Sequence, residues 1–239
     1  RHNRTLLRRA LGVGAALALM GGTLPAAWAE PGGEATNQDA DEQAVDAGGG
    51  GGDDVLVTIP GSHNKAMGCD ADWAPDCAKA ALTRDATGVY TATFTLPAGD
   101  YQYKVAEGGS WDVSFGVGGA PGGANISYTL TDTTEVTFYY NHATHRVWNT
   151  ATDQMVTLPG SLQKALGCAD NWKPDCLAPL MEPVDDGTYT YATTALPEGS
   201  YELKVAIGGS WNENYGQDGA AGGANYQFAT KANKLVTFT

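Results

Sequence analysis

The chain has 239 residues, a length that allows one or two domains. Its 27 acidic residues against 14 lysines and arginines give a net charge of −13 near neutral pH. So acidic a protein repels phosphate backbones, which excludes nucleic acid as an expected partner.

The first 29 residues predict a secretory signal peptide. Four arginines within residues 1–9 precede an apolar run at 10–24, and the motif Ala27-Trp28-Ala29 follows. This order is typical of a signal peptide cleaved after Ala29, and the run is shorter than the about 20 residues that span a bilayer. We therefore expect a secreted, extracellular protein with no membrane partner. Because the first residue is Arg rather than Met, we expect the start of the chain to be incomplete.

Residues 30–53 form an acidic, polar segment that ends in five consecutive glycines. Such a composition buries too little apolar surface to offset the entropy that folding costs. We expect this segment to be a disordered linker.

After the linker the chain repeats itself with a period near 100 residues. The motif VTIPGS at 57–62 returns as VTLPGS at 156–161, and GGSW at 108–111 returns at 208–211. This period suits an independently folding domain and is too long for a solenoid unit. We therefore predict module 1 at 54–151 and module 2 at 154–239. Module 2 ends at the position of Tyr139 in module 1, so we expect it to be truncated, with more chain downstream.

Apolar and polar residues alternate within each module, for example at 101–106 and 136–140. A period of two between Pro, Gly and Asp-Gly turn signals predicts short antiparallel strands. The predicted fold class is all-β, with two tandem antiparallel, immunoglobulin-like β-sandwich modules after the signal peptide and the disordered linker. We expect Tyr90, Tyr101 and their counterparts Tyr189 and Tyr201 in the cores, and one helical turn within 61–82.

The four cysteines form two pairs that each enclose seven residues, and these are Cys69, Cys77, Cys168 and Cys176. Export places them in an oxidising compartment, so we predict the disulfides Cys69–Cys77 and Cys168–Cys176. A four-thiolate zinc site is the alternative, although zinc-binding cysteine pairs usually stand closer together in sequence.

Neither module offers a clear catalytic set. A glycosidase usually needs two carboxylates at a fixed separation. Only two acidic positions recur in both modules, and the one shared by Asp76 and Asp175 adjoins a half-cystine. His63 is replaced by Leu162, so no Ser-His-Asp set recurs either. We expect no catalytic residue in this chain, which would not itself be an enzyme.

Metal and cofactor sites are also not expected. Asp70 and Asp72 resemble part of a calcium loop, but the loop's glycine and distal glutamate are missing and module 2 replaces both aspartates. The glycine-rich stretches at 116–123 and 216–223 lack the lysine and the strand-to-helix context of a phosphate-binding loop.

The side chains that do recur suit a sugar. An exposed indole is a flat platform for the apolar face of a pyranose, while lysine and asparagine can bind its hydroxyl groups. The alternative is that these tryptophans fill the core of each sandwich. The predicted glucan-binding residues are Trp73, Lys104, Trp111 and Asn125 in module 1, and Trp172, Lys204, Trp211, Tyr215 and Asn225 in module 2.

The motifs PGS, G-C-x-x-x-W-x-P-D-C, K-V-A, GGSW and GGAN all occur twice. Together they resemble the X25-type module of amylopullulanases, a β-sandwich starch-binding relative, over nearly all of both modules. The resemblance implies starch binding and a covalently linked catalytic domain downstream that hydrolyses α-glucan linkages. Module 2 reads WNENYG at 211–216 as that family does, whereas module 1 reads WDVSFG at 111–116, so we expect a weaker or merely structural site in module 1.

The expected function is non-catalytic binding of α-glucan (starch, amylopectin or pullulan), which would target a pullulanase-type or amylolytic enzyme to polysaccharide. The alternative is a structural spacer or protein-interaction pair of β-sandwiches without sugar binding. A third interpretation makes the fragment itself hydrolytic.

Overall fold

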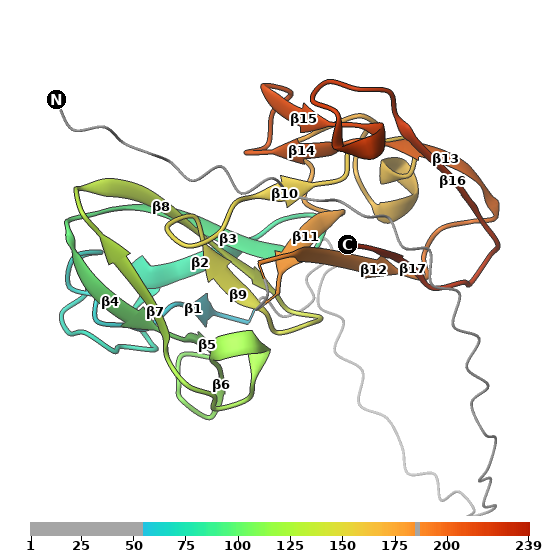
Figure 1. Cartoon of the computed structure of the whole chain (residues 1–239). Coiled ribbons are helices and arrows are strands. Elements are labelled where there is room, and N and C mark those ends of the chain that lie inside the picture. The colour runs from blue at the N-terminus through green and yellow to red at the C-terminus, as the bar shows by residue number, and fades with distance from the viewer. Residues whose placement is uncertain (1–54, 185–186) are drawn as a thin grey trace, which may run out of the picture. The chain divides into compact units, whose positions relative to one another are not determined.

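The computed structural model describes residues 55–184 and 187–239, so the predicted signal peptide (1–29) and linker (30–53) lie outside the described residues. Within the described part, the regular elements are β-strands and short 3₁₀ turns, and every strand pairing is antiparallel (Figure 1). The predicted all-β class is confirmed. None of the described residues belongs to a helix that is long and apolar enough to cross a bilayer.

Module 1 is built from one large and one small antiparallel sheet. The large sheet has the strand order β6-β5-β1-β2-β3-β8-β9, and β4 pairs with β7 in the small one. The elements are β1 (Val57–Thr58), η1 (Ala78–Ala80), β2 (Ala81–Arg84), β3 (Val89–Leu96), β4 (Gly99–Tyr103), β5 (Val105–Glu107), β6 (Val113–Phe115), η2 (Val117–Gly119), β7 (Ile126–Leu130), β8 (Thr134–Asn141) and β9 (Val147–Asn149).

Module 2 repeats this plan. Its large sheet has the order β15-β14-β10-β11-β12-β17, and β13 pairs with β16. Among the described residues it has no counterpart of β9. The elements are β10 (Val156–Thr157), η3 (Gln163–Leu166), β11 (Leu180–Pro183), β12 (Tyr189–Thr193), β13 (Gly199–Leu203), β14 (Val205–Ile207), β15 (Glu213–Tyr215), η4 (Gln217–Gly219), β16 (Tyr226–Thr230) and β17 (Val236–Phe238).

The cores follow the period-two pattern of the strands. On β4, Tyr101 and Tyr103 are buried while Gln102 between them is exposed. Successive side chains of a strand point to opposite faces, so the inward tyrosines meet the buried residues of β7 and β8 in one apolar cluster. The expected core positions Tyr90 and Tyr101 are confirmed, and their module 2 counterparts are half-buried against that module's core.

Each module holds one loop closed by a disulfide. Cys69–Cys77 and Cys168–Cys176 are both bonded, with Cα atoms 6.0 Å apart in each pair, and no described cysteine is free. The disulfide prediction is confirmed, and the alternative four-thiolate zinc site is wrong. Closing so short a loop stabilises the fold by about 2–3 kcal/mol through the entropy of the unfolded chain. The turn η1 adjoins the first disulfide, where a helical turn was predicted.

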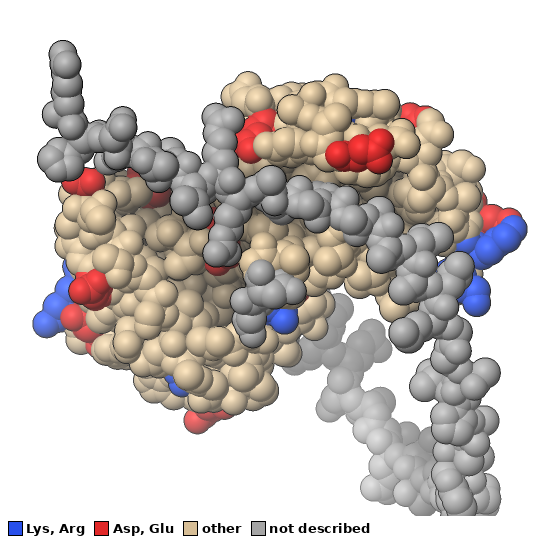
Figure 2. Space-filling model, in the orientation of Figure 1, with Lys and Arg blue, Asp and Glu red and all other residues tan. Residues whose placement is uncertain are grey.

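Acidic side chains stand in separate small groups on the face that Figure 2 shows, rather than in one continuous patch. Such a distribution is typical of solvated surface charge.

Candidate functional site

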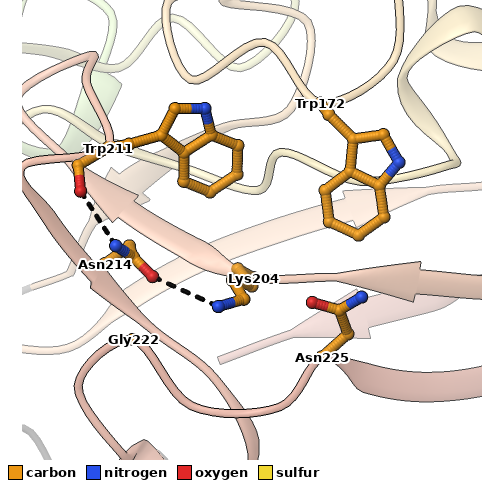
Figure 3. Close-up of a pocket in the computed structure, with 6 residues that line it drawn as sticks. All are labelled: Trp172, Lys204, Trp211, Asn214, Gly222 and Asn225. Carbon is orange, nitrogen blue, oxygen red and sulfur yellow. Dashed lines mark hydrogen bonds between the residues drawn. The ribbon is translucent and has the colours of Figure 1, made fainter.

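Module 2 has an open hollow of about 480 Å³ at one end of its strands. The residues that line it are Trp172, Lys204, Trp211, Asn214, Gly222 and Asn225 (Figure 3). They come from the disulfide loop, the β13–β14 junction, the β14–β15 hairpin and the glycine-rich segment before β16. Four separate segments thus supply one concave surface.

Module 1 has the corresponding hollow, with a volume of about 360 Å³. It is lined by Trp73, Lys104, Trp111 and Asn125, which are the counterparts of four of the module 2 residues. The ring centroids of Trp73 and Trp111 lie 6.4 Å apart and their planes are inclined by 39°. The two indoles therefore form one bent aromatic surface.

The hairpin tryptophans are open to solvent. The exposed fraction is 43% for Trp111 and 41% for Trp211, each in the turn that follows two glycines with positive φ. The alternative that these two indoles fill the sandwich cores is therefore wrong. A large apolar side chain held at the surface beside polar groups is typical of a ligand contact.

The loop tryptophans are held in an unusual backbone conformation. Trp73 and Trp172 have φ values of 60° and 61°, in the left-handed region that a bulky residue rarely adopts. Strain of this kind persists where the surroundings enforce it, and it is concentrated at functional sites. Its occurrence in both modules indicates that the direction of each indole is fixed by the fold.

Hydrogen bonds between each disulfide loop and the segment before it support that conformation. In module 2 the backbone N–H of Trp172 donates to the carbonyl of Gly160 (3.4 Å), and the side-chain oxygen of Gln163 accepts from the N–H of Lys173 (2.8 Å). In module 1 the buried Asn64 occupies the position of Gln163. Its Oδ1 accepts from the N–H groups of Gly61 and Ala74 at 2.9 and 3.2 Å. Each loop is thus tied to the sheet as well as closed by its disulfide.

The polar groups of the two hollows differ at one position. In module 2 the ammonium of Lys204 donates to Oδ1 of Asn214 (3.4 Å), and Nδ2 of Asn214 donates to the carbonyl of Trp211 (2.9 Å), as Figure 3 shows. Asn214 therefore connects the cation to the turn that carries the exposed indole. Module 1 has Ser114 at this position, and Lys104 donates to the carbonyl of Gly122 instead (3.2 Å).

The second amide is oriented in the same way in both modules. Nδ2 of Asn225 donates to Glu202 (3.0 Å), and Nδ2 of Asn125 donates to Gln102 (3.1 Å). In Figure 3 the side-chain oxygen of Asn225 points toward Lys204. Each hollow thus combines indole surfaces with an ammonium and an amide, a set that can stack on a sugar ring and bind its hydroxyl groups.

Tyr215 is the one predicted site residue that does not line a hollow. Its ring packs against the core of module 2 and its hydroxyl donates to Glu213 (2.8 Å). Two lining residues, Asn214 and Gly222, were not predicted. The difference between WNENYG and WDVSFG could have indicated Asn214, because module 1 has Ser114 at that position. Nothing in the sequence distinguishes Gly222 from the other glycines of its segment.

Comparison with known proteins gives one match in each module. The family model described as the pullulanase X25 domain matches residues 56–147 and 155–239. Amylopullulanases of Thermoanaerobacter thermohydrosulfuricus and Thermoanaerobacterium thermosulfurigenes are 34% and 33% identical to the chain over 193 residues. These alignments cover 77% of the chain but only 13% and 10% of the two relatives, so the chain spans a small part of their length.

Two solved structures resemble the chain at lower similarity. A pullulanase from Bacillus acidopullulyticus has a TM-score of 0.38 and 17% identity, covering 66% of the chain and 28% of the pullulanase. SusF from Bacteroides thetaiotaomicron has a TM-score of 0.28 and 15% identity, covering 76% of the chain and 48% of SusF. Since the family model matches both modules and most of the residues, the chain belongs to the pullulanase X25 domain family.

Proposed function

We propose that the two modules bind α-glucans such as starch, amylopectin and pullulan, and that they do so without catalysing a reaction. The observation that carries this proposal is the pairing of an exposed indole with a second, loop-held indole beside a lysine and an asparagine in both modules. The names of the family and of its amylopullulanase relatives support a polysaccharide ligand.

The bend between the two indoles favours a curved ligand. α-1,4-linked glucan chains curve, so neighbouring glucose rings can each meet one of the two platforms, which in module 1 are inclined by 39°. The ammonium and the amide then bind hydroxyl groups at the edge of the rings. Each site is shallow, and the desolvation of sugar hydroxyls offsets much of the gain from stacking. Two sites on one chain raise the effective concentration of the second contact to about the millimolar range.

We infer that the modules hold a catalytic domain of the same polypeptide on its substrate. The chain spans only 10–13% of the two amylopullulanases named above, which leaves most of those proteins for other domains. An extracellular location is part of this proposal, because the two disulfides suit an oxidising compartment.

Native electrophoresis in gels that contain amylopectin tests the binding proposal directly. The full chain should migrate more slowly as amylopectin is added, because each indole pair can engage glucose rings of the immobile polymer. Hydroxyethyl cellulose, a β-1,4-linked glucan, is the matched polymer and should leave the mobility unchanged. Unaltered mobility in amylopectin, together with tryptophan fluorescence that does not respond to maltoheptaose, would support the spacer interpretation instead.

Replacing Asn214 with serine, the residue of module 1, should weaken maltoheptaose binding by module 2. The change removes the hydrogen bonds from Lys204 and to Trp211. We expect Lys204, no longer positioned by Asn214, to lose one hydrogen bond to a sugar hydroxyl. A net contribution of about 0.5–1.5 kcal/mol for that one bond predicts a loss of about 2- to 12-fold. Fluorescence titration in a Trp111→Ala background isolates module 2. Asn212→Asp is the control, since it also introduces a module 1 residue but does not line the hollow; equal affinities for the two variants would contradict this role of Asn214.

A further inference from the structure

We propose that module 1 carries a separate binding site for a divalent transition-metal ion, with Zn²⁺ as the best fit, formed by Glu107, His142 and His145. One carboxylate oxygen and one nitrogen of each imidazole lie within 4.8 Å of one another. Two imidazoles and a carboxylate are donors that zinc prefers, whereas calcium and magnesium select oxygen ligands. A small inward movement of these side chains brings the three donors to the separations of a metal's ligands.

The fold brings these residues together from distant strands. Glu107 ends β5, His142 directly follows β8, and His145 lies in the turn from β8 to β9. Strands β1, β2 and β3 separate β5 from β8 in the sheet, yet the hydroxyl of Tyr140 on β8 donates to Oε1 of Glu107 (2.5 Å). The cluster is therefore a product of the tertiary structure rather than of a local motif.

The ring of His145 is held in a fixed position. It stacks on Phe115 with 3.9 Å between centroids and 4° between planes. Its backbone has a φ of 58°, in the left-handed region, and a Cβ atom on Gly119 would lie 2.8 Å from its carbonyl oxygen. The ring of Phe115 and the backbone of Gly119 thus fix the position of His145 before any ligand binds. Backbone strain of this kind is typical of functional sites.

Hydrogen bonds orient the remaining donors. The single hydrogen of the Tyr140 hydroxyl goes to Glu107, so Nδ1 of His145 donates to the Tyr140 oxygen (2.9 Å). Nδ1 of His142 lies 2.9 Å from the same oxygen of Glu107 and donates to it. An ion bound among the three groups would displace the His142 proton that now joins His142 to Glu107. Tyr140 would remain as the donor that orients the carboxylate. Partners of this kind stabilise metal ligands in known sites.

Exposure and charge also suit a cation. The side chain of His142 is 52% exposed, which leaves a path from solvent, whereas that of Glu107 is only 11% exposed. A largely desolvated carboxylate beside two imidazoles gains from a positive ion. Module 2 has Ile207 in place of Glu107 and no histidine at all, so the site belongs to module 1 alone. We expected no metal from the sequence, and none of these three residues recurs in module 2.

Titration of the EDTA-treated full chain with Co²⁺ tests the proposal. Tetrahedral cobalt bound by nitrogen and oxygen ligands gives a visible absorption band that hydrated Co²⁺ lacks, and Zn²⁺ should abolish the band by displacement. We expect one equivalent of cobalt, bound at least tenfold more weakly by His142→Ala and by Glu107→Gln. Excess Ca²⁺ should leave the band unchanged.

Glu213→Gln supplies the matched control. Glu213 also accepts a tyrosine hydroxyl, from Tyr215, but lies in the module without histidines. This variant should bind cobalt as the unaltered chain does. Because His142 is exposed, His142→Ala should keep the circular dichroism spectrum and the melting temperature of the metal-free protein. The proposal is rejected if the chain shows no such band, or if His142→Ala and Glu107→Gln bind cobalt as tightly as Glu213→Gln.

Discussion

Replacing Trp211 with alanine should weaken maltoheptaose binding by module 2 at least tenfold, which corresponds to a loss of about 1.4 kcal/mol. Trp211 is 41% exposed and lines the larger hollow. Its removal deletes the open stacking surface, and truncating an aromatic anchor of this kind commonly costs more than 1 kcal/mol. Isothermal titration calorimetry of the full chain in a Trp111→Ala background measures the effect on module 2 alone.

Leu235→Ala is the control for the loss of an exposed apolar side chain. Leu235 is 67% exposed in module 2 and does not line the hollow, so this variant should keep the affinity. Trp211→Phe should keep part of the binding, because a smaller ring still offers a stacking face. Trp211 lies in a turn rather than in the core, so the melting temperature should barely change in any of these variants. A Trp211→Ala chain that binds maltoheptaose at full strength would show that the hollow is not the glucan site.

The internal repeat explains why most of the candidate site could be predicted. Trp73, Lys104, Trp111 and Asn125 come from four separate segments, and a single module would give no reason to group them. Because each has a counterpart in module 2, the comparison of the two copies separates these residues from surface positions that vary. The structure then brings both sets into hollows.

Tyr215 shows what the repeat could not reveal. β14 and β15 pair so that Tyr215 stands opposite Val205 and Asn214 stands opposite Ala206. Opposite residues of an antiparallel pair share a face, so Tyr215 lies with the buried Val205 on the core side. The register depends on the length of the turn around GGSW, and a shift of one residue would exchange the two faces. Composition and alternation alone do not determine that register.

The cluster of Glu107, His142 and His145 was missed for a related reason. Two of its residues lie in a segment that has no counterpart in module 2, and the third is replaced there by Ile207. Comparison of the copies therefore discards all three. Their proximity depends on the path of a sheet in which three strands separate β5 from β8, and local sequence patterns carry no information about that path.

Lowering the pH from 7 to about 4 should destabilise module 1 by up to about 3 kcal/mol through one buried histidine. The side chain of His63 is fully buried among aromatic rings, with Nε2 bonded to the carbonyl of Ile59 (2.9 Å) and Nδ1 to the hydroxyl of Tyr128 (2.8 Å). Burial lowers the pKa of His63 from 6.5 to about 4, although the hydrogen bond to Ile59 and the negative charge of Asp72 act in the opposite direction.

The sign of this effect follows from proton linkage. Because the pKa of His63 is lower in the folded than in the unfolded chain, the unfolded chain binds the proton first as the pH falls. The contribution of neutral His63 to the free energy of unfolding is therefore complete above about pH 6.5 and is lost between about pH 6.5 and 4. Each unit of difference between the two pKa values corresponds to about 1.4 kcal/mol. Module 2 has Leu162 at this position and lacks the effect.

Hydrogen–deuterium exchange measures both modules in one sample. Peptides from β4 and β7 should lose protection as the pH falls from 7 to 4.5, relative to peptides from β13 and β16, after correction for the intrinsic exchange rate. His63→Gln, whose amide can replace the hydrogen bonds but does not titrate in this range, should remove the difference between the modules. The prediction is contradicted if, in the unaltered chain, the protection of module 1 relative to module 2 stays the same from pH 7 to 4.5. Protonation of His63 would then not destabilise module 1.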